Sequence, residues 1–208
     1  MRTKTAELWA EQDKHPGDHH RLFGAVAEAV DAETVLYPGS WCDVAASFVW
    51  PSVTYVDKDR RAVRFFDDPG GVREIIAAVA GAPADPEVGF IRADYTEPLP
   101  LAADGFDLLV SLYAGPVSRH CTSYLRVGGA LLANPSHGDV ALASIDPRLE
   151  LSGVVTPRGG GYRATTADLE QYLVPKKPVE ITAELIERTG RGVAYTNQAF
   201  AYLFRRVR

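Results

Sequence analysis

The order of short apolar runs along this chain constrains its fold more than any other feature of the sequence. Runs of strand-like composition occur at residues 34–37, 52–56, 88–93, 106–111 and 130–133. Most of them are separated by segments in which apolar residues have helical spacing, at 43–49, 59–66, 72–79 and 116–125. Strands that alternate with helices in this way join through right-handed crossovers into a mostly parallel sheet. The chain is therefore predicted to have an α/β fold.

A single domain accounts for the whole length of 208 residues, because no internal repeat or low-complexity linker interrupts the pattern. Residues 1–32 are expected to form an N-terminal helical extension, residues 33–145 a ligand-binding core, and residues 146–208 additional strands and a helix. In this last part the pattern predicts a hairpin at 149–166 around three consecutive glycines, a helix at 182–189 and a strand at 200–207. We expect that final strand to lie at the edge of the sheet.

Composition and charge exclude several classes of protein. The net charge of -5 gives no general attraction to nucleic acid or to anionic membranes. No stretch of about 18 apolar residues occurs, and the N-terminus lacks the apolar core of a signal peptide, so we expect a cytoplasmic protein with no membrane association. The two cysteines lie far apart without a metal-binding spacing, and no metal site is predicted, including at the histidines 15, 19 and 20. A small-molecule partner is expected rather than nucleic acid, and the oligomeric state stays open.

Three of the predicted strands end in groups that suit an adenine nucleoside. The first strand runs into a tight turn, where Gly39 allows close approach of the backbone to a ligand. The second ends at Asp57, 18 positions after Gly39, and the third ends at Asp94. Because neighbouring parallel strands finish at the same edge of a sheet, these residues are expected to converge on one ligand. A carboxylate at Asp57 can accept from two ribose hydroxyls, and one at Asp94 from the adenine amino group.

Four segments of the chain resemble the class I S-adenosylmethionine-dependent methyltransferase family. They are VLYPGS at 35–40, VTYVDKD at 53–59, IRADYTEPLPLAADGFDLLVS at 91–111 and YLRVGGALLA at 124–133. The resemblance covers roughly residues 20–145 and implies a doubly wound, mostly parallel, seven-stranded sheet with helices on both faces and an antiparallel C-terminal edge strand. It also implies S-adenosylmethionine as the cofactor and methyl transfer as the activity, and we expect the unidentified methyl acceptor to be a small molecule.

The resemblance assigns roles to particular residues. The turn 37–40 would lie against the methionine part of the cofactor, Asp57 would hold the ribose, and Lys58 would cover the edge of the adenine. Asp94 and Tyr95 would contact the base, and Ser111 would lie near the sulfonium and the substrate. The full set of implied cofactor-binding residues is Tyr37, Pro38, Gly39, Ser40, Asp57, Lys58, Asp94, Tyr95 and Ser111.

The glycine-rich turn departs from the family pattern. The family has an acidic residue where this chain has Tyr37, and glycines where it has Trp41 and Asp43. The bulky Trp41 must point away from the ligand, stack on it or fill its pocket. Asp43 either replaces the missing carboxylate or caps a helix. These departures keep two alternatives open: a catalytically silent binding domain of the same fold, and an NAD-dependent oxidoreductase, which is disfavoured by the lack of GxGxxG and of a Tyr-x-x-x-Lys pair.

Candidates for the catalytic base follow the fourth and fifth strands. His137 lies just beyond the fifth strand, where it is either a base or a first-turn residue of a helix with Ser136 as its N-cap. Tyr113 follows the fourth strand and is the second candidate. The less favoured His120 falls within a predicted helix, where a partly buried histidine is the simpler interpretation.

Overall fold

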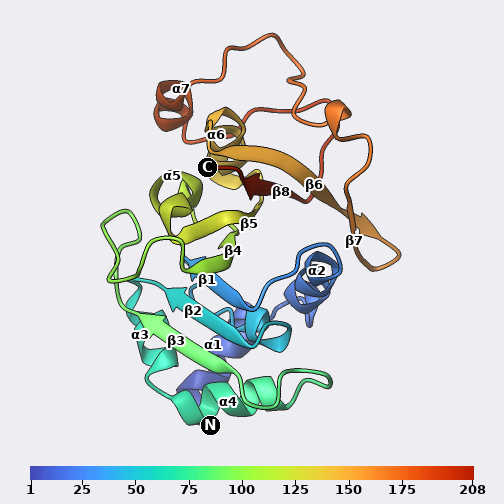
Figure 1. Ribbon diagram of the computed structural model, residues 1–208. Helices are drawn as coiled ribbons and strands as arrows, with labels where there is room; N and C mark the ends of the chain where they lie inside the picture. The colour runs from blue at the N-terminus through green and yellow to red at the C-terminus, as the bar shows by residue number, and fades with distance from the viewer.

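The computed structural model describes all 208 residues as an eight-stranded mixed sheet flanked by helices (Figure 1). The strand order is β3-β2-β1-β4-β5-β8-β6-β7; the five strands from β3 to β5 pair in parallel, and β8, β6 and β7 pair antiparallel. The predicted α/β, mostly parallel, doubly wound fold is confirmed. The strands are β1 (Thr34–Pro38), β2 (Ser52–Val56), β3 (Glu87–Ile91), β4 (Phe106–Ser111), β5 (Leu125–Ala133), β6 (Leu149–Arg158), β7 (Gly161–Thr165) and β8 (Ala201–Arg206).

Two details of the sheet differ from expectation: it has eight strands rather than seven, and the last strand, β8, is internal rather than at the edge. β8 pairs with β5 on one side and with β6 on the other, so that β7 becomes the edge. The composition of β8 explains its place, because Tyr202, Leu203 and Phe204 are each at most 2% exposed and face alternate sides of the sheet. An edge strand would leave one row of its backbone groups unpaired beside these apolar side chains.

Helices cover both faces of the sheet. Along β1, Val35 and Tyr37 belong to one core, and Leu36 belongs to the other, as the two-residue period of a strand requires. The first core is closed by α1, α2, α3 and α4, and the second by α5 and α6, while α7 packs on α6. The helices are α1 (Thr3–Gln12), α2 (Asp18–Ala27), α3 (Arg60–Phe66), α4 (Pro69–Ala77), α5 (Val117–Cys121), α6 (Asp139–Ile145) and α7 (Ala183–Thr189).

The predicted helix at 43–49 is reduced to one 3-10 turn, Ala45–Phe48. Its backbone forms short-range bonds, such as that from the Ser47 N–H to the Val44 carbonyl at 2.9 Å, and a tyrosine side chain supplies further partners. The hydroxyl of Tyr55 donates to the carbonyl of Val44 at 3.2 Å and accepts from the backbone N–H of Ser47 at 3.1 Å. The predicted helix at 116–125 is likewise shorter, since α5 ends at Cys121 and a 3-10 turn, Thr122–Tyr124, follows it.

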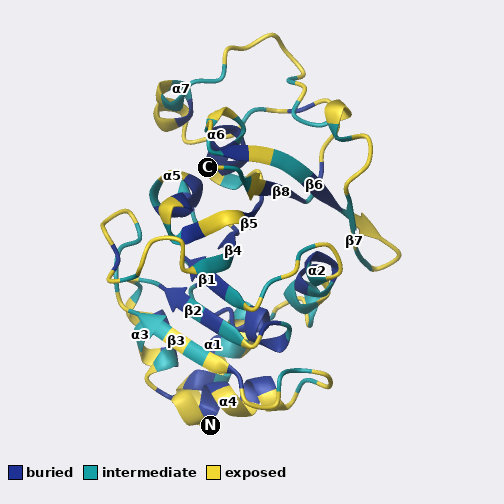
Figure 2. Cartoon of the chain, viewed as in Figure 1, coloured by how far each residue is buried: buried dark blue, intermediate teal, exposed yellow.

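Burial falls off toward the two edges of the sheet (Figure 2). The central strands β1 and β4 are almost wholly buried, whereas β3 and β7 carry half-buried and exposed residues. None of the helices has the length and apolar character needed to cross a lipid bilayer.

Candidate functional site

The carboxyl ends of β1, β2 and β3 form one pocket, which we call the strand-end pocket. Its volume is about 300 Å³, and the expected trio of Gly39, Asp57 and Asp94 lies together in its wall. The three strands are neighbours in parallel register, with Pro38 opposite Val56 and Val56 opposite Ile91, so their ends coincide. The lining residues are Gly39, Asp57, Lys58, Ala93, Asp94, Tyr95, Thr96 and Ala114.

Asp57 fixes the shape of the turn that follows β1. One carboxylate oxygen accepts from the backbone N–H of Trp41 at 2.8 Å, and the other accepts from that of Asp59 at 2.7 Å. An ionised carboxylate can accept about four hydrogen bonds, so Asp57 retains capacity for a ligand's hydroxyls while it holds the turn.

Lys58 and Asp94 form an ion pair on the rim of the strand-end pocket. The Lys58 Nζ lies 2.5 Å from the Asp94 carboxylate, whose other oxygen accepts from the backbone N–H and the hydroxyl of Thr96. The hydrogen bond from Lys58, with those from Thr96, lowers the pKa of Asp94 to about 2. Asp94 is therefore an anionic acceptor at neutral pH.

The loop after β4 packs directly onto the glycine turn. Gly39 has a φ of 67°, and a Cβ at this position would overlap the Cβ of Ala114. The hydroxyl of Tyr95 donates to the carbonyl of Ala114 at 2.6 Å and so holds the loop in place. Glycine is thus required at position 39 by the neighbouring loop as well as by the turn, which the sequence pattern did not indicate.

Four residues of the implied cofactor set do not line the strand-end pocket: Tyr37, Pro38, Ser40 and Ser111. Tyr37 points into the first core, where its hydroxyl donates to Asp43 at 2.9 Å. Ser111 is 1% exposed, and its hydroxyl donates to the buried Asp139 at 2.5 Å. Ser40 is also buried, and its hydroxyl has no hydrogen-bond partner.

Trp41 points away from the strand-end pocket. Its backbone has a φ of 50°, and its indole packs against the first core with the guanidinium of Arg61 5.1 Å from the ring centroid. Of the three orientations considered for this side chain, the structure selects the one that leaves the pocket open.

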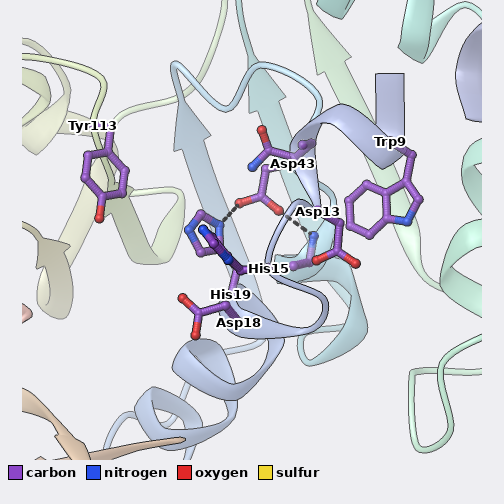
Figure 3. Close-up of a pocket in the computed structure, with 9 residues that line it drawn as sticks. Trp9, Asp13, His15, Asp18, His19, Asp43 and Tyr113 are labelled. Carbon is purple, nitrogen blue, oxygen red and sulfur yellow. Dashed lines mark hydrogen bonds and ion pairs between the residues drawn. The ribbon is translucent and has the colours of Figure 1, made fainter. Parts of the chain in front are cut away.

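A second pocket, of about 240 Å³, lies on the other side of the β4 loop, and we call it the histidine pocket (Figure 3). At its centre, His19 Nδ1 lies 2.6 Å from the carboxylate of Asp43, which is itself 1% exposed. No three His, Cys, Asp or Glu side chains are arranged to hold a metal ion. The lining residues are Trp9, Gln12, Asp13, His15, Asp18, His19, Asp43, Ala45 and Tyr113.

The two candidate bases are placed differently. Tyr113 has a φ of 58°, is 56% exposed and stands at the mouth of the histidine pocket, across from Trp9 in Figure 3. His137 lines neither pocket: it is exposed, and its Nδ1 lies 2.6 Å from the hydroxyl of Ser136. Ser136 does not cap the helix that follows, because α6 begins at Asp139.

Sequence reasoning missed the pairing of His19 with Asp43. The sequence left two roles open for Asp43, a ligand-binding carboxylate or a helix cap. In the structure Asp43 accepts a hydrogen bond from the Ala45 N–H at 3.0 Å, as a cap would, and also pairs with His19. A signal was present in the sequence, since His19 shares the helical spacing of Leu22, Phe23 and Val26 and therefore faces inward.

The environment of His19 acts on its pKa in two directions. Burial lowers the pKa, whereas the hydrogen bond that His19 donates to Asp43 and the charges of Asp43, Asp18 and Asp13 raise it, and the net result is a pKa above the usual value for histidine. The neighbouring carboxylates therefore favour the protonated form of the His19 imidazole.

Comparisons with known proteins identify the fold. No family model and no curated protein sequence matches the chain. Among solved structures, the YcgJ protein of Bacillus subtilis matches with a TM-score of 0.51 at 15% identity, over 91% of this chain and 99% of that one. The 16S rRNA methylase RmtB matches with a TM-score of 0.52 at 14% identity, over 98% and 72% of the two chains. A proposed O-methyltransferase from Klebsiella pneumoniae matches with a TM-score of 0.50 at 12% identity, over 79% and 88%.

At such identities the similarity concerns the fold alone. This similarity in fold agrees with the strand order, in which β8, β6 and β7 form the antiparallel side of the sheet. The chain has the fold of the class I S-adenosylmethionine-dependent methyltransferases.

Proposed function

We propose that this protein is an S-adenosylmethionine-dependent methyltransferase that acts on a small molecule. The observation that carries the proposal is the convergence of Gly39, Asp57 and Asp94 in one pocket at the carboxyl ends of three parallel strands. In a sheet of this fold, such a pocket is the expected place for a nucleoside.

The residues of the strand-end pocket fit the adenosine part of this cofactor. Asp57 would accept from the ribose hydroxyls, Asp94 would accept from the adenine amino group, and Ala93 and Tyr95 would frame the ring. Gly39 would face the methionine part, where the buried hydroxyl of Ser40 still lacks a partner. When bound, S-adenosylmethionine supplies a methyl group on a positively charged sulfur, and the chain's own residues need only position the acceptor and remove a proton.

The proposal is tested by the binding of S-adenosylhomocysteine to wild type and to Asp57→Asn, measured by titration calorimetry. Loss of hydrogen bonds to a charged acceptor costs about 1.5–3 kcal/mol, so the dissociation constant should rise about 10–100-fold. Asp85→Asn is the matched control, because Asp85 is exposed and precedes β3 at the opposite edge of the sheet. Equal losses in both variants, or none in Asp57→Asn, would contradict the assignment.

A second candidate is a binding domain of the same fold without catalysis. It is favoured by the packing of Ala114 against Gly39, which fills space beside the turn. Thermal unfolding distinguishes the candidates: a ligand at 100 times its dissociation constant adds about 2.7 kcal/mol. That gain raises Tm by roughly 5–10 °C for a domain of this size. A rise with S-adenosylmethionine supports the methyltransferase, no rise with any ligand favours the silent domain, and a rise only with NAD favours the oxidoreductase.

A further inference from the structure

The histidine pocket contains a carboxylate–imidazole pair that neither the fold nor the strand-end pocket requires. Asp43 is held from three sides, by the hydroxyl of Tyr37 at 2.9 Å, the backbone N–H of Ala45 at 3.0 Å and His19 Nδ1 at 2.6 Å. Tyr37 comes from β1 and His19 from α2, so two elements fix the carboxylate. A buried carboxylate in this network is a rigid acceptor for the Nδ1 proton of His19.

This arrangement fixes the orientation and the tautomer of His19. Since the carboxylate accepts a hydrogen bond from Nδ1–H, the neutral imidazole carries its lone pair on Nε2. His19 Nε2 has no protein partner, and the side chain is 22% exposed in the wall of the histidine pocket (Figure 3). The exposed nitrogen of a carboxylate-bound imidazole is suited to accept a proton from a bound molecule.

The lining of the histidine pocket favours a cation. Three aspartates, Asp13, Asp18 and Asp43, face it together with two histidines. No lysine or arginine lines it, although Asp18 is paired with Arg21 outside the lining. Trp9 from α1 and Tyr113 from the β4 loop add aromatic surface on opposite sides of the opening. Carboxylates combined with aromatic rings form a favourable environment for an ammonium group.

The two pockets adjoin along two segments of the chain. Tyr113 lines the histidine pocket, and the next residue, Ala114, lines the strand-end pocket. The turn after β1 makes the same connection, with Gly39 in the strand-end pocket and Asp43 in the histidine pocket. A molecule in the histidine pocket therefore lies next to the end of the strand-end pocket at which the methionine part of the cofactor is proposed to bind.

We propose that the histidine pocket is the acceptor site, that it takes a small primary or secondary amine, and that His19, oriented by Asp43, removes the proton which the amine must lose. The assignment rests on the proposed methyltransferase function. His19 is then a catalytic residue, and Asp43 is a positioning residue that acts through it.

The step balances as follows. Neutral Nε2 of His19 takes one proton from the bound ammonium, which frees the nitrogen lone pair. That lone pair forms the new bond to the methyl carbon while the carbon–sulfur bond breaks and leaves its electron pair on sulfur. The products are the protonated N-methyl amine and a neutral thioether, and the imidazolium of His19 returns its proton to solvent.

The first test is the state of His19, read by NMR of the ¹⁵N-labelled imidazole. We expect the Nδ1–H tautomer at high pH and a pKa above that of an unperturbed histidine, which should fall in Asp43→Asn. His20→Gln on the same helix identifies the resonance of the neighbouring histidine, which packs against Phe48 instead. An Nε2–H tautomer in the wild-type protein overturns the proposal, even if Asp43→Asn fails to fold.

The second test is binding of phenethylamine to the protein saturated with S-adenosylhomocysteine, with 2-phenylethanol and phenylacetate as neutral and anionic probes of similar size. Of the three probes, we expect only phenethylamine to bind at millimolar concentrations or below and to shift the His19 resonances. Equal or tighter binding of phenylacetate, or no response of His19 to any probe, overturns the amine assignment.

Different results would contradict the acceptor-site proposal and the methyltransferase proposal. His19→Gln should retain the wild-type affinity for S-adenosylhomocysteine, because His19 does not line the strand-end pocket. It should lower the rate of amine methylation by about 10²–10⁴-fold, the usual contribution of a general base, whereas His20→Gln should not. Unchanged methylation by His19→Gln overturns the acceptor-site proposal alone, whereas failure of wild type to bind S-adenosylhomocysteine overturns the function on which it rests.

Discussion

Asp139 is a deeply buried carboxylate beside the strand ends, and it joins β4 to α5. It lies at the start of α6, is 1% exposed, and accepts from the hydroxyl of Ser111 at the end of β4 and from the backbone and hydroxyl of Ser118 in α5. Burial raises its pKa, the hydrogen bonds from the two serines lower it, and the net value is about 6. Ser111 therefore serves this structural network.

The shifted pKa of Asp139 predicts a specific pH dependence of stability. The folded protein holds this proton more tightly than the unfolded chain, whose Asp has a pKa near 4, so the free energy of unfolding should fall as the pH rises from about 4 to about 6. A shift of about two units corresponds to about 3 kcal/mol. Urea unfolding at several pH values should show this fall in wild type and not in Asp139→Asn.

The exposed Asp31→Asn variant serves as the control for the loss of one negative charge. If the difference in unfolding free energy between wild type and Asp139→Asn were constant from pH 4 to pH 7, the assignment of the shifted pKa would be wrong.

At the scale of elements, the loop between β4 and α5 separates the two pockets, and side chains of Tyr95 and Asn134 bind its backbone. Tyr95, after β3, donates to the carbonyl of Ala114, and its hydroxyl lies against Gly115, where a Cβ would come within 2.8 Å of the Tyr95 oxygen. The position of the loop thus depends on a residue 19 positions earlier in the chain.

We expect Tyr95→Phe to loosen this loop. Removing the hydroxyl leaves the Ala114 carbonyl without its partner, which should lower the free energy of unfolding by about 1 kcal/mol and speed amide hydrogen exchange in residues 112–116. Tyr124→Phe is the matched control, because its hydroxyl accepts from the Leu99 N–H at 2.8 Å in a different loop. Equal exchange rates in residues 112–116 of wild type and Tyr95→Phe would contradict the role given to this hydroxyl.

At the scale of the whole molecule, the first core joins the N-terminal helices to the C-terminal strands, and the second joins β1 to β8. The first core contains Leu8 and Leu203, and the second contains Leu36 and Phe204. The hydroxyl of Tyr162 in β7 donates to Asp18 of α2 at 2.9 Å, across 144 positions of sequence. The N-terminal helices and the C-terminal strands are therefore parts of one packed unit rather than appendages to residues 33–145.

The sequence predicts that residues 1–208 form one domain, and we therefore expect a single cooperative unfolding transition. In scanning calorimetry, the measured enthalpy should equal the van't Hoff enthalpy, because neither core can lose one part without exposing the rest. A chain that ends at residue 145 should fail to fold, since β5 would lose its partner β8. Two separate transitions, or a stable folded 1–145 fragment, would contradict the single domain.

The sequence by itself determined the parallel half of the fold and the strand-end pocket. Apolar runs that end at Gly39, Asp57 and Asp94 are local signals, and the rule that neighbouring parallel strands finish together turns them into a site. The errors concern partners outside the element itself. The shortened helix at 43–49 depends on Tyr55 in the following strand, and the internal position of β8 depends on β6.

Only the tertiary structure decided which side chains meet across elements. The bond between His19 and Asp43 joins residues 24 positions apart, and the contact between Gly39 and Ala114 joins residues still further apart. No periodicity within one element specifies such pairs, because each depends on how helices and loops dock on the sheet. Trp41 illustrates the same principle, since its orientation away from the strand-end pocket follows from its packing against the first core and Arg61.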